Sequence, residues 1–399
     1  MTVSRLQPYA TTVFAEMSAL AERLGAVNLG QGFPDEDGPA AMLKAAQDAI
    51  AAGVNQYPPG IGIPALRQAI AAHRKRHFGV EYDPDTEVLV TVGATEAIAA
   101  AVLGVVEPGS EVLLIEPFYD SYSPVVVLAG AQRIAVPLVP DGRGFALDTD
   151  ALRRSVTPRT RALIVNSPHN PTGTVLGPAE LAVIAEVATA GDLVVITDEV
   201  YEQLVYPSPA GHRHIPLATY PGMAERTITI SSASKMFNCT GWKIGWACGP
   251  PQLIAAVRAA KQYLSYVGGA PFQPAVALAL NTEDAWVAAL RTLLQARRDR
   301  LAAALADIGF GVHDSFGTYF LCADPRPLGY HDSTAFCAML PEKVGVAAIP
   351  MAAFCDPANR HADVWNHLVR FTFCKRDDTL DEAIRRLGLL RDGLTTAAT

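Results

Sequence analysis

Two lysines stand among small residues in the segment Ser231-Ser-Ala-Ser-Lys-Met-Phe-Asn-Cys-Thr-Gly-Trp-Lys-Ile-Gly-Trp246. The first, Lys235, follows residues 227–230, whose Thr-Ile-Thr-Ile pattern is typical of a β-strand. Its small neighbours leave room for the lysine stem to reach into a cavity. An amine that is partly desolvated and lies near another cation has a lowered pKa, and it can attack a carbonyl group to form a Schiff base. The second lysine, Lys243, supplies that cation, and two cations this close favour an anionic ligand such as phosphate.

A second motif, Leu193-Val-Val-Ile-Thr-Asp-Glu-Val-Tyr-Glu202, ends a predicted strand with an acid. Because five apolar or β-branched residues precede Asp198, we expect its carboxylate to be buried, and a buried carboxylate needs a partner. A protonated ring nitrogen of a cofactor is one such partner, and a turn-capping role for Asp198 is the alternative. Tyr201 comes three residues later and is expected to reach the same ligand.

Two further turns follow predicted strands. Residues 91–98 read as a strand, a glycine turn and a helix, a geometry that directs free backbone N–H groups at an anion. Gly93, Ala94 and Thr95 are therefore candidates for a phosphate cradle. The second turn, Asn166-Ser-Pro-His-Asn-Pro-Thr-Gly173, lies where open α/β sheets bind ligands. Taken alone, the first turn is more typical of a helix N-cap without a ligand, and the second turn is a common one.

A substrate anion has a candidate receptor near the C-terminus. Arg370 alternates into the apolar face of the predicted strand 367–373, and an inward arginine needs an anion. A substrate carboxylate and a structural ion pair are the two alternatives. Near the N-terminus, the loop 27–34 contains two glycines where backbone can approach a ligand closely.

The order of elements predicts an α/β architecture. Short apolar runs alternate with helical patterns over residues 47–281, which indicates a mostly parallel sheet covered on both faces. A chain of 399 residues favours two domains. We expect an N-terminal arm with part of a small domain at 1–46, a large ligand-binding domain at 47–281, and a small α+β domain at 282–399.

Two helices are predicted in the C-terminal region. Residues Thr282–Ile308 have the pattern of one long helix, with Thr282 as its N-cap. Residues Thr379–Leu390 have the pattern of a second helix, in which Thr379 and Glu382 have the spacing of a capping box.

Composition excludes several classes of protein. The formal net charge of −8 argues against general nucleic-acid binding, which requires a basic surface. No apolar run reaches the roughly 18 residues of a membrane span, and the N-terminus has no apolar signal core. Six cysteines show neither a Cys-x-x-Cys pair nor a metal spacing. We therefore expect buried thiols in a reducing cytoplasm, without a metal site.

Taken together, the motifs resemble the class I aminotransferases, which carry pyridoxal 5′-phosphate and have fold type I. The resemblance runs from about Phe14 to Arg386 and is strongest in Ser-Ala-Ser-Lys followed by Thr-Gly-Trp-Lys-Ile-Gly. Within the class the chain is similar to the kynurenine, methionine and glutamine aminotransferase branch, and most similar to the N-succinyldiaminopimelate aminotransferases of lysine biosynthesis. Lys243 departs from the wider class, in which many members carry an arginine that grips phosphate with two bonds. The fold implied has a large, mostly parallel, seven-stranded sheet.

The resemblance also implies a role for each candidate residue. Lys235 is the catalytic residue, and Tyr119 covers the pyridine ring, with the adjacent Phe118 as an alternative one position away. Tyr57 reaches the cofactor of a neighbouring subunit, which implies a homodimer. The full set of implied cofactor-binding residues is Tyr57, Gly93, Ala94, Thr95, Tyr119, Asn166, Asn170, Asp198, Tyr201, Ser232, Lys235 and Lys243. The implied substrate-binding residues are Phe14, Gly32, Asn170 and Arg370.

The expected reaction is therefore a transamination, with N-succinyl-LL-diaminopimelate as donor and 2-oxoglutarate as acceptor. Kynurenine, methionine or glutamine is the alternative donor, and β-elimination from a cysteine conjugate is an alternative reaction on the same scaffold. A non-catalytic regulator with an aminotransferase-like domain would need a DNA-binding module. The first 46 residues predict only one good helix and the charge balance is acidic, so this class is disfavoured.

Overall fold

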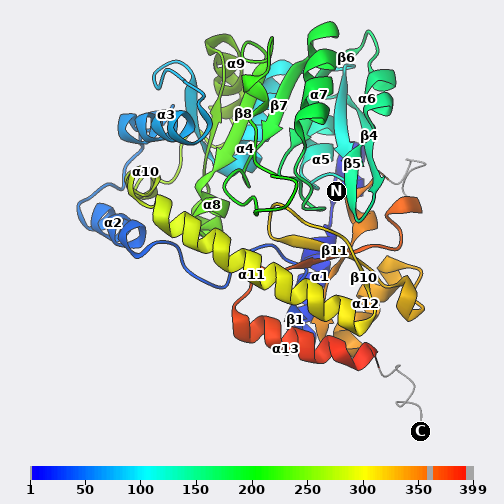
Figure 1. Ribbon diagram of the computed structural model, residues 1–399. Helices are drawn as coiled ribbons and strands as arrows, with labels where there is room; N and C mark the ends of the chain where they lie inside the picture. The colour runs from blue at the N-terminus through cyan, green and yellow to red at the C-terminus, as the bar shows by residue number, and fades with distance from the viewer. Residues whose placement is uncertain (1, 357–362, 392–399) are drawn as a thin grey trace.

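An eight-stranded sheet forms the centre of the computed structural model, which describes residues 2–356 and 363–391 (Figure 1). The strand order is β2-β9-β8-β7-β6-β3-β4-β5. Strands β8, β7, β6, β3 and β4 pair in parallel, while β9 is antiparallel to both β8 and β2, and β5 is antiparallel to β4. The strands are β2 (Val88–Val92), β3 (Glu111–Glu116), β4 (Gln132–Asp141), β5 (Gly144–Leu147), β6 (Thr160–Asn166), β7 (Val194–Asp198), β8 (Thr227–Ser232) and β9 (Ile244–Cys248).

The predicted α/β fold is confirmed, but the expected count of seven strands is one short. The additional strand, β5, returns from β4 through a turn at Gly142 and pairs only with residues 138–141. Pro137 and Pro140 interrupt the strand pattern of β4, because proline lacks the N–H group that a central strand donates. The proline at 140 is tolerated at this edge, where β4 already leaves its parallel neighbour and pairs with β5 alone.

Helices cover both faces of the sheet, which explains why the strands are apolar on both sides. One face packs against α4 (Gly93–Val105), α5 (Tyr122–Leu128) and α9 (Pro251–Lys261). The other face packs against α7 (Pro178–Ala190) near the middle of the sheet and against α3 (Pro64–Phe78) and α10 (Phe272–Thr282) at the β2–β9 edge. Two further helices, α2 (Ala40–Ala51) and α6 (Thr149–Ser155), contact α10 and α7 respectively.

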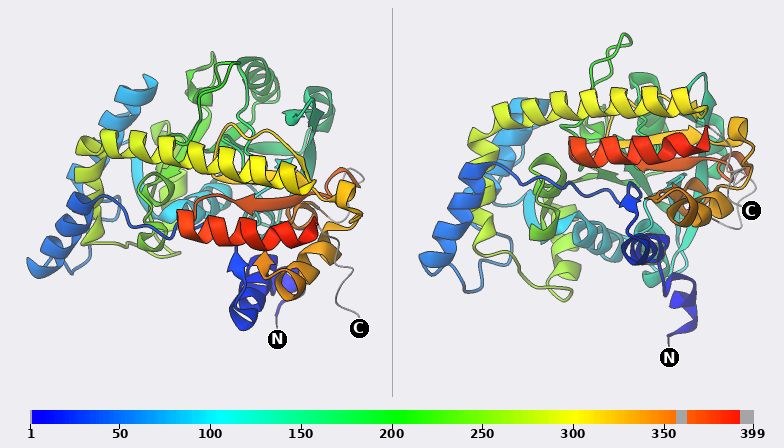
Figure 2. Two further views of the ribbon diagram at one scale, coloured as in Figure 1. Left: turned by 60° about the horizontal axis from the view of Figure 1, so that its bottom comes forward. Right: turned by 90° about the horizontal axis from the view of Figure 1, so that it is seen from below.

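A second, four-stranded sheet lies below the first in Figure 1 and has the order β10-β11-β14-β13. Its strands are β10 (Gly311–Val312), β11 (Phe320–Asp324), β13 (Ile349–Pro350) and β14 (Val369–Thr372). The long α11 (Asp284–Ile308) runs beside α13 (Asp377–Leu387), as both views of Figure 2 show, and α12 (Ser333–Lys343) packs nearby.

The N-terminal arm joins this second region. After α1 (Val13–Leu24), β1 (Val27–Asn28) pairs in parallel with β12 (Val346–Ala347). Domain boundaries at 46/47 and 281/282 stay a prediction.

Two helix predictions were wrong in detail. Residue Glu283 has non-helical dihedral angles, so α10 and α11 are separate, and the Thr282 hydroxyl donates to the Leu278 carbonyl at the end of α10 instead of capping α11. In α13 there is no capping box, because Glu382 bonds to Arg385 and Arg386 instead of returning to the helix start.

The expected state of the cysteines is confirmed, since all six are buried free thiols. Within the part of the chain that the structure describes, no helix has the length and apolar character needed to cross a bilayer. The cytoplasmic location expected from the sequence stays a prediction.

Candidate active site

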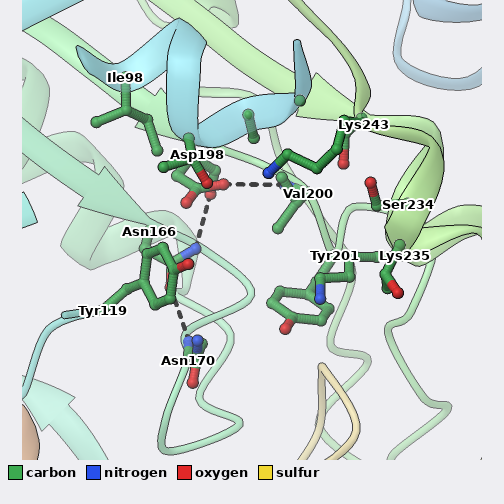
Figure 3. Close-up of a pocket in the computed structure, with 15 residues that line it drawn as sticks. Ile98, Tyr119, Asn166, Asn170, Asp198, Val200, Tyr201, Ser234, Lys235 and Lys243 are labelled. Atoms are coloured by element: carbon green, nitrogen blue, oxygen red, sulfur yellow. Dashed lines mark hydrogen bonds between the residues drawn. The ribbon is translucent and has the colours of Figure 1, made fainter. Parts of the chain in front are cut away.

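A cavity of about 200 Å³ opens at the carboxyl edge of the large sheet (Figure 3). The turns after β2, β3, β6, β7 and β8 meet there, because the carboxyl ends of parallel strands share one edge. Eleven of the twelve predicted cofactor-binding residues line the cavity, and only Tyr57 does not. The lining residues are Gly93, Ala94, Thr95, Ile98, Tyr119, Asn166, Asn170, Asp198, Val200, Tyr201, Ser232, Ser234, Lys235, Thr240 and Lys243.

Lys235 lies on the short helix α8 (Ala233–Met236), directly after β8. Its Nζ lies 3.4 Å from the Gly32 carbonyl oxygen and 5.9 Å from the centre of the Tyr201 ring. Burial, together with the nearby cations Arg370 and Lys243, lowers the pKa of the Lys235 amine to about 8. A larger fraction of this amine is therefore neutral, and nucleophilic, near neutral pH than for an exposed lysine.

Asp198 is buried at the end of β7 and has protein hydrogen-bond partners for both oxygens. The Tyr122 hydroxyl donates to Oδ2 at 2.6 Å, and the Val200 N–H donates to Oδ1 at 3.3 Å. Burial raises the pKa of the Asp198 carboxyl, while the Tyr122 bond acts in the opposite direction. Lys235 is the nearby cation that also favours the charged form, so a bound cationic group would add the compensation that this buried carboxylate requires.

The opposite end of the cavity is built to receive an anion. Helix α4 begins at Gly93, and the first N–H groups of a helix have no partner within the helix. Lys243 adopts a left-handed conformation with φ of 55°, and its amine points into the cavity (Figure 3). Ser232, Ser234 and Thr240 also line the cavity.

A chain of hydrogen bonds connects the cavity floor to Arg370 (Figure 3 shows its first two bonds). The Asn166 Nδ2 group donates to the Asp198 backbone carbonyl at 2.9 Å, and the Asn170 N–H donates to Asn166 Oδ1 at 2.7 Å. Arg370 Nη1 then donates to Asn170 Oδ1 at 2.9 Å, and its Nη2 donates to the Gly30 carbonyl at 2.6 Å. The two asparagines thus fix the arginine relative to the cavity.

Arg370 is 1% exposed, yet no carboxylate among the described residues forms an ion pair with it. Its Nε is buried without a hydrogen-bond partner among these residues. The guanidinium instead lies 3.9 Å from the centre of the Phe320 ring and 5.2 Å from that of Phe14. Burial lowers the pKa of Arg370 to about 10. A buried cation that contacts only rings and carbonyls is suited to bind an anion. The alternative of a structural ion pair at Arg370 is not found among the described residues.

The remaining predicted substrate residues adjoin Arg370. Gly32 leaves no space for a side chain, because a Cβ there would lie 2.4 Å from the Phe320 ring. Its carbonyl accepts bonds from Lys235 and, at 2.6 Å, from the Tyr319 hydroxyl. Phe14 packs edge-on against Phe354 at 5.5 Å.

Tyr57 does not line the cavity. Its side chain is 82% exposed and contacts the ring of Tyr266 at 5.6 Å. Of the two aromatic candidates after β3, Tyr119 lines the cavity, while Phe118 packs into the core cluster beneath it.

Sequence reasoning missed several residues of the site. Tyr122 is the first residue of α5 and follows Tyr119 by three residues, and this closeness in the sequence was the available signal. Phe320 is the first residue of β11 in the second sheet and Tyr319 directly precedes it, and nothing local in the sequence connects them with Lys235. Ile98, Val200, Ser234 and Thr240 flank predicted residues and could have been included by proximity.

A buried charge cluster supports the turn that carries Asp198 and Tyr201. Arg74 forms ion pairs with Glu199 and Glu202, and His214 Nε2 lies 2.9 Å from Glu199 Oε2. The carboxylates and His214 are close enough together to resemble a metal site. The guanidinium of Arg74 already bonds both carboxylates, so the cluster is suited to a structural role.

Chemically, the cavity combines a nucleophilic amine, an anion cradle, a buried carboxylate and a second anion receptor at Arg370. This set is suited to a ligand with a phosphate, a reactive carbonyl group and a basic ring nitrogen, beside a substrate with a carboxylate.

The comparisons with known proteins agree with this chemistry. The model of the class I and II aminotransferase family matches residues 25–387. A probable N-succinyldiaminopimelate aminotransferase of Mycobacterium tuberculosis is 81% identical over 396 residues, which cover 98% of this chain and 99% of the relative. A methionine aminotransferase of Escherichia coli is 38% identical over 385 residues, covering 96% and 97%. Among solved structures, the N-succinyldiaminopimelate aminotransferase of Mycobacterium tuberculosis superposes with a TM-score of 0.95 at 82% identity, covering 98% of this chain and all of that one.

Proposed function

Since the chain belongs to the class I and II aminotransferase family and is an aminotransferase, we propose that it uses pyridoxal 5′-phosphate, with N-succinyl-LL-diaminopimelate as amino donor and 2-oxoglutarate as acceptor. The observation that carries the donor is the 81% identity, over nearly the full length of both chains, to a relative bearing that activity in its name. Members of the family generally depend on pyridoxal phosphate.

The fit of the cofactor rests on groups that line the cavity. Lys243 makes no hydrogen bond or ion pair with another described residue, and together with the start of α4 it would hold the phosphate. Asp198 would bond the protonated pyridine nitrogen, and Tyr119 would cover the ring. Asn170 and Tyr201 would bond its phenolic oxygen. When bound, the cofactor supplies an electron sink for the bond changes at the substrate Cα.

The catalytic work of the protein then falls mainly on Lys235. Its amine would hold the cofactor until the donor amine displaces it. The freed amine would take the proton from the donor Cα as a general base and return it as a general acid. Arg370 would grip the α-carboxylate, and Phe14 and Gly32 would border the donor. The pKa of about 8 suits this exchange, since an amine titrating near the working pH both accepts and releases a proton readily.

We also propose a homodimer. An aromatic patch made of Tyr57, Tyr263, Leu264 and Tyr266 is exposed, and the exposed fraction of Tyr263 reaches 85%. Exposed apolar groups gathered in one place favour an interface. A second copy of this chain is the proposed partner, with each Tyr57 reaching the phosphate of the other subunit. Light scattering of the purified protein tests this, and a monomer that keeps full activity would contradict it.

Donor choice is tested by comparing kcat/KM for N-succinyl-LL-diaminopimelate, methionine, glutamine and kynurenine with 2-oxoglutarate as common acceptor. We expect the succinylated donor to be preferred by at least about 100-fold, which corresponds to about 2.7 kcal/mol in the barrier. If methionine or kynurenine matches it, the donor assignment is wrong, while the transaminase assignment remains.

Arg370→Gln is expected to lower kcat/KM at least tenfold for every donor and acceptor, because all of them carry an α-carboxylate. Hydrogen bonds to a charged group contribute about 1.5–3 kcal/mol. Steady-state kinetics with two donors and two acceptors measure the effect. The control is Arg385→Gln on the exposed face of α13, which should leave kinetics unchanged. A loss confined to one substrate would mean that Arg370 recognises a side chain.

Gly93→Ala is expected to weaken cofactor binding at least tenfold. A Cβ at this position would lie 3.0 Å from Lys243 Cε and 3.1 Å from Nζ, and would displace the lysine from the phosphate site. The matched control is Gly109→Ala, which has a similar positive φ of 83° but open space around it, so it reproduces the backbone strain alone. Titration of the apoenzyme with pyridoxal phosphate measures both, and equal effects would assign the loss to strain.

A further inference from the structure

Lys261 is a buried cation that the catalytic scheme does not use. It is the last residue of α9 and is only 2% exposed. No carboxylate of a described residue lies within ion-pairing distance of it. Lysine is among the residues that are almost never fully buried unless they are paired. Its burial in the absence of a bonded acid therefore requires other compensation.

That compensation comes from two loops. The Lys261 amine donates to the Gly60 carbonyl at 2.8 Å and to the Tyr266 carbonyl. Tyr266 has a φ of 64°, which a non-glycine residue adopts only when its surroundings hold it there. Burial lowers the pKa of Lys261, and the Glu96 carboxylate acts in the opposite direction. One ammonium group thus joins two segments that are about 200 residues apart in the sequence.

Both segments lie next to or within the aromatic patch. Gly60 follows Tyr57 by three residues, and Tyr266 is itself a member that contacts the Tyr57 ring. A second buried side chain makes a parallel connection, since Gln273 accepts from the Ile63 N–H and donates to the Gly268 carbonyl, both at 2.9 Å. Tyr57 itself is 82% exposed and makes no hydrogen bond with another described residue, so the position of its hydroxyl depends on the loop that carries it.

We propose that Lys261 is a positioning residue for the cofactor site of the neighbouring subunit: it holds the loops 57–62 and 263–268 in the geometry that presents Tyr57 across the interface. This inference rests on the proposed dimer and on the proposed role of Tyr57. The effect of Lys261 would then appear in the cofactor site of the other subunit, although the residue is buried in its own subunit.

The first measurement is cofactor affinity. Lys261→Met keeps the apolar stem and removes the three donors, and it should weaken pyridoxal phosphate binding about tenfold, as Tyr57→Phe should. The double variant should bind pyridoxal phosphate no more weakly than either single variant, because the two substitutions remove the same contact. Lys261→Arg should restore most of the affinity. The exposed Lys44→Met on α2 controls for the loss of a lysine. Independent, additive effects of Lys261 and Tyr57 would overturn the proposal.

The second measurement distinguishes an effect of Lys261 on the neighbouring subunit from a structural role within its own subunit. A heterodimer of Lys261→Met and Lys235→Ala subunits, purified with two tags, has one site with Lys235. That site receives Tyr57 from the subunit whose Lys261 is intact. We expect it to bind the cofactor with wild-type affinity and to give about half the wild-type activity. Retention of the weakened affinity in this heterodimer would overturn the inference.

A parallel heterodimer of Tyr57→Phe and Lys235→Ala subunits tests the premise. If this heterodimer binds the cofactor with wild-type affinity and the Lys261→Met heterodimer does not, only the proposed role of Lys261 is wrong. If neither is rescued, Tyr57 does not act across an interface and the proposed dimeric site fails. Should Lys261→Met not fold, as judged by circular dichroism, Lys261→Gln is used in the same experiment.

Discussion

Replacing Lys235 by alanine is expected to lower kcat/KM by about 10⁴-fold or more. General acid–base catalysis alone contributes about 10²–10⁴, and the variant also loses the amine that would hold the cofactor. The overall structure should persist, because the Lys235 amine makes a single long hydrogen bond, to the Gly32 carbonyl at 3.4 Å. Steady-state kinetics with the succinylated donor and 2-oxoglutarate measure the loss.

Attachment of the cofactor to Lys235 can be measured independently of the kinetics. Borohydride reduction followed by peptide mass spectrometry should find the cofactor attached to Lys235 in the native protein. Lys44→Ala, an exposed change on α2, should keep native rates and the same attachment site. Turnover of the Lys235→Ala protein at the native rate would remove this lysine from the mechanism.

Asp198→Asn is expected to retain the cofactor but to lower kcat by about 100-fold. The amide fills the same space, and it lacks the charge that would keep the pyridine nitrogen protonated. The buried setting makes the charge effective, because an electrostatic interaction is stronger where water is excluded. Kinetics combined with a visible spectrum of the bound cofactor separate loss of function from loss of binding.

The graded control is Tyr122→Phe, which removes the 2.6 Å hydrogen bond to Asp198 and leaves its charge in place. A hydrogen bond to a charged group contributes about 1.5–3 kcal/mol, but the Asp198 charge itself remains, so this variant should lose less activity than Asp198→Asn. If Asp198→Asn loses less than tenfold, about 1.4 kcal/mol, the pyridinium role is wrong.

Those parts of the cavity that lie in continuous motifs could be predicted from the sequence. Lys235, Asp198 and Asn170 each lie at or just after the end of a strand with a clear apolar pattern, and the parallel arrangement brings such strand ends together. Arg370 was identifiable because a charged residue interrupts an apolar strand face.

The parts that depend on tertiary packing could not be predicted. Phe320 lies 3.9 Å from the Arg370 guanidinium, yet its own segment gives no sign of that contact. The long helix was predicted to begin at Thr282, but α11 begins at Asp284, and Thr282 is the last residue of α10, a helix that was not predicted. Strand β5 was also missed, since four residues paired with a proline-containing edge give little alternation to detect.

The pairing of β1 with β12 sets an order of events during synthesis of the chain. The anion cradle and both active-site lysines lie between residues 93 and 243, so they leave the ribosome well before the C-terminal segment. Segment 27–32 emerges first, but its β partner is absent until Val346 has been synthesised. The Leu29 carbonyl likewise gains its hydrogen-bond donor only when Thr372 has been synthesised. Arg370 meets the Gly30 carbonyl at the same late stage. A nascent chain can therefore assemble its phosphate-binding half early, while the receptor for the substrate carboxylate closes only when translation is nearly complete.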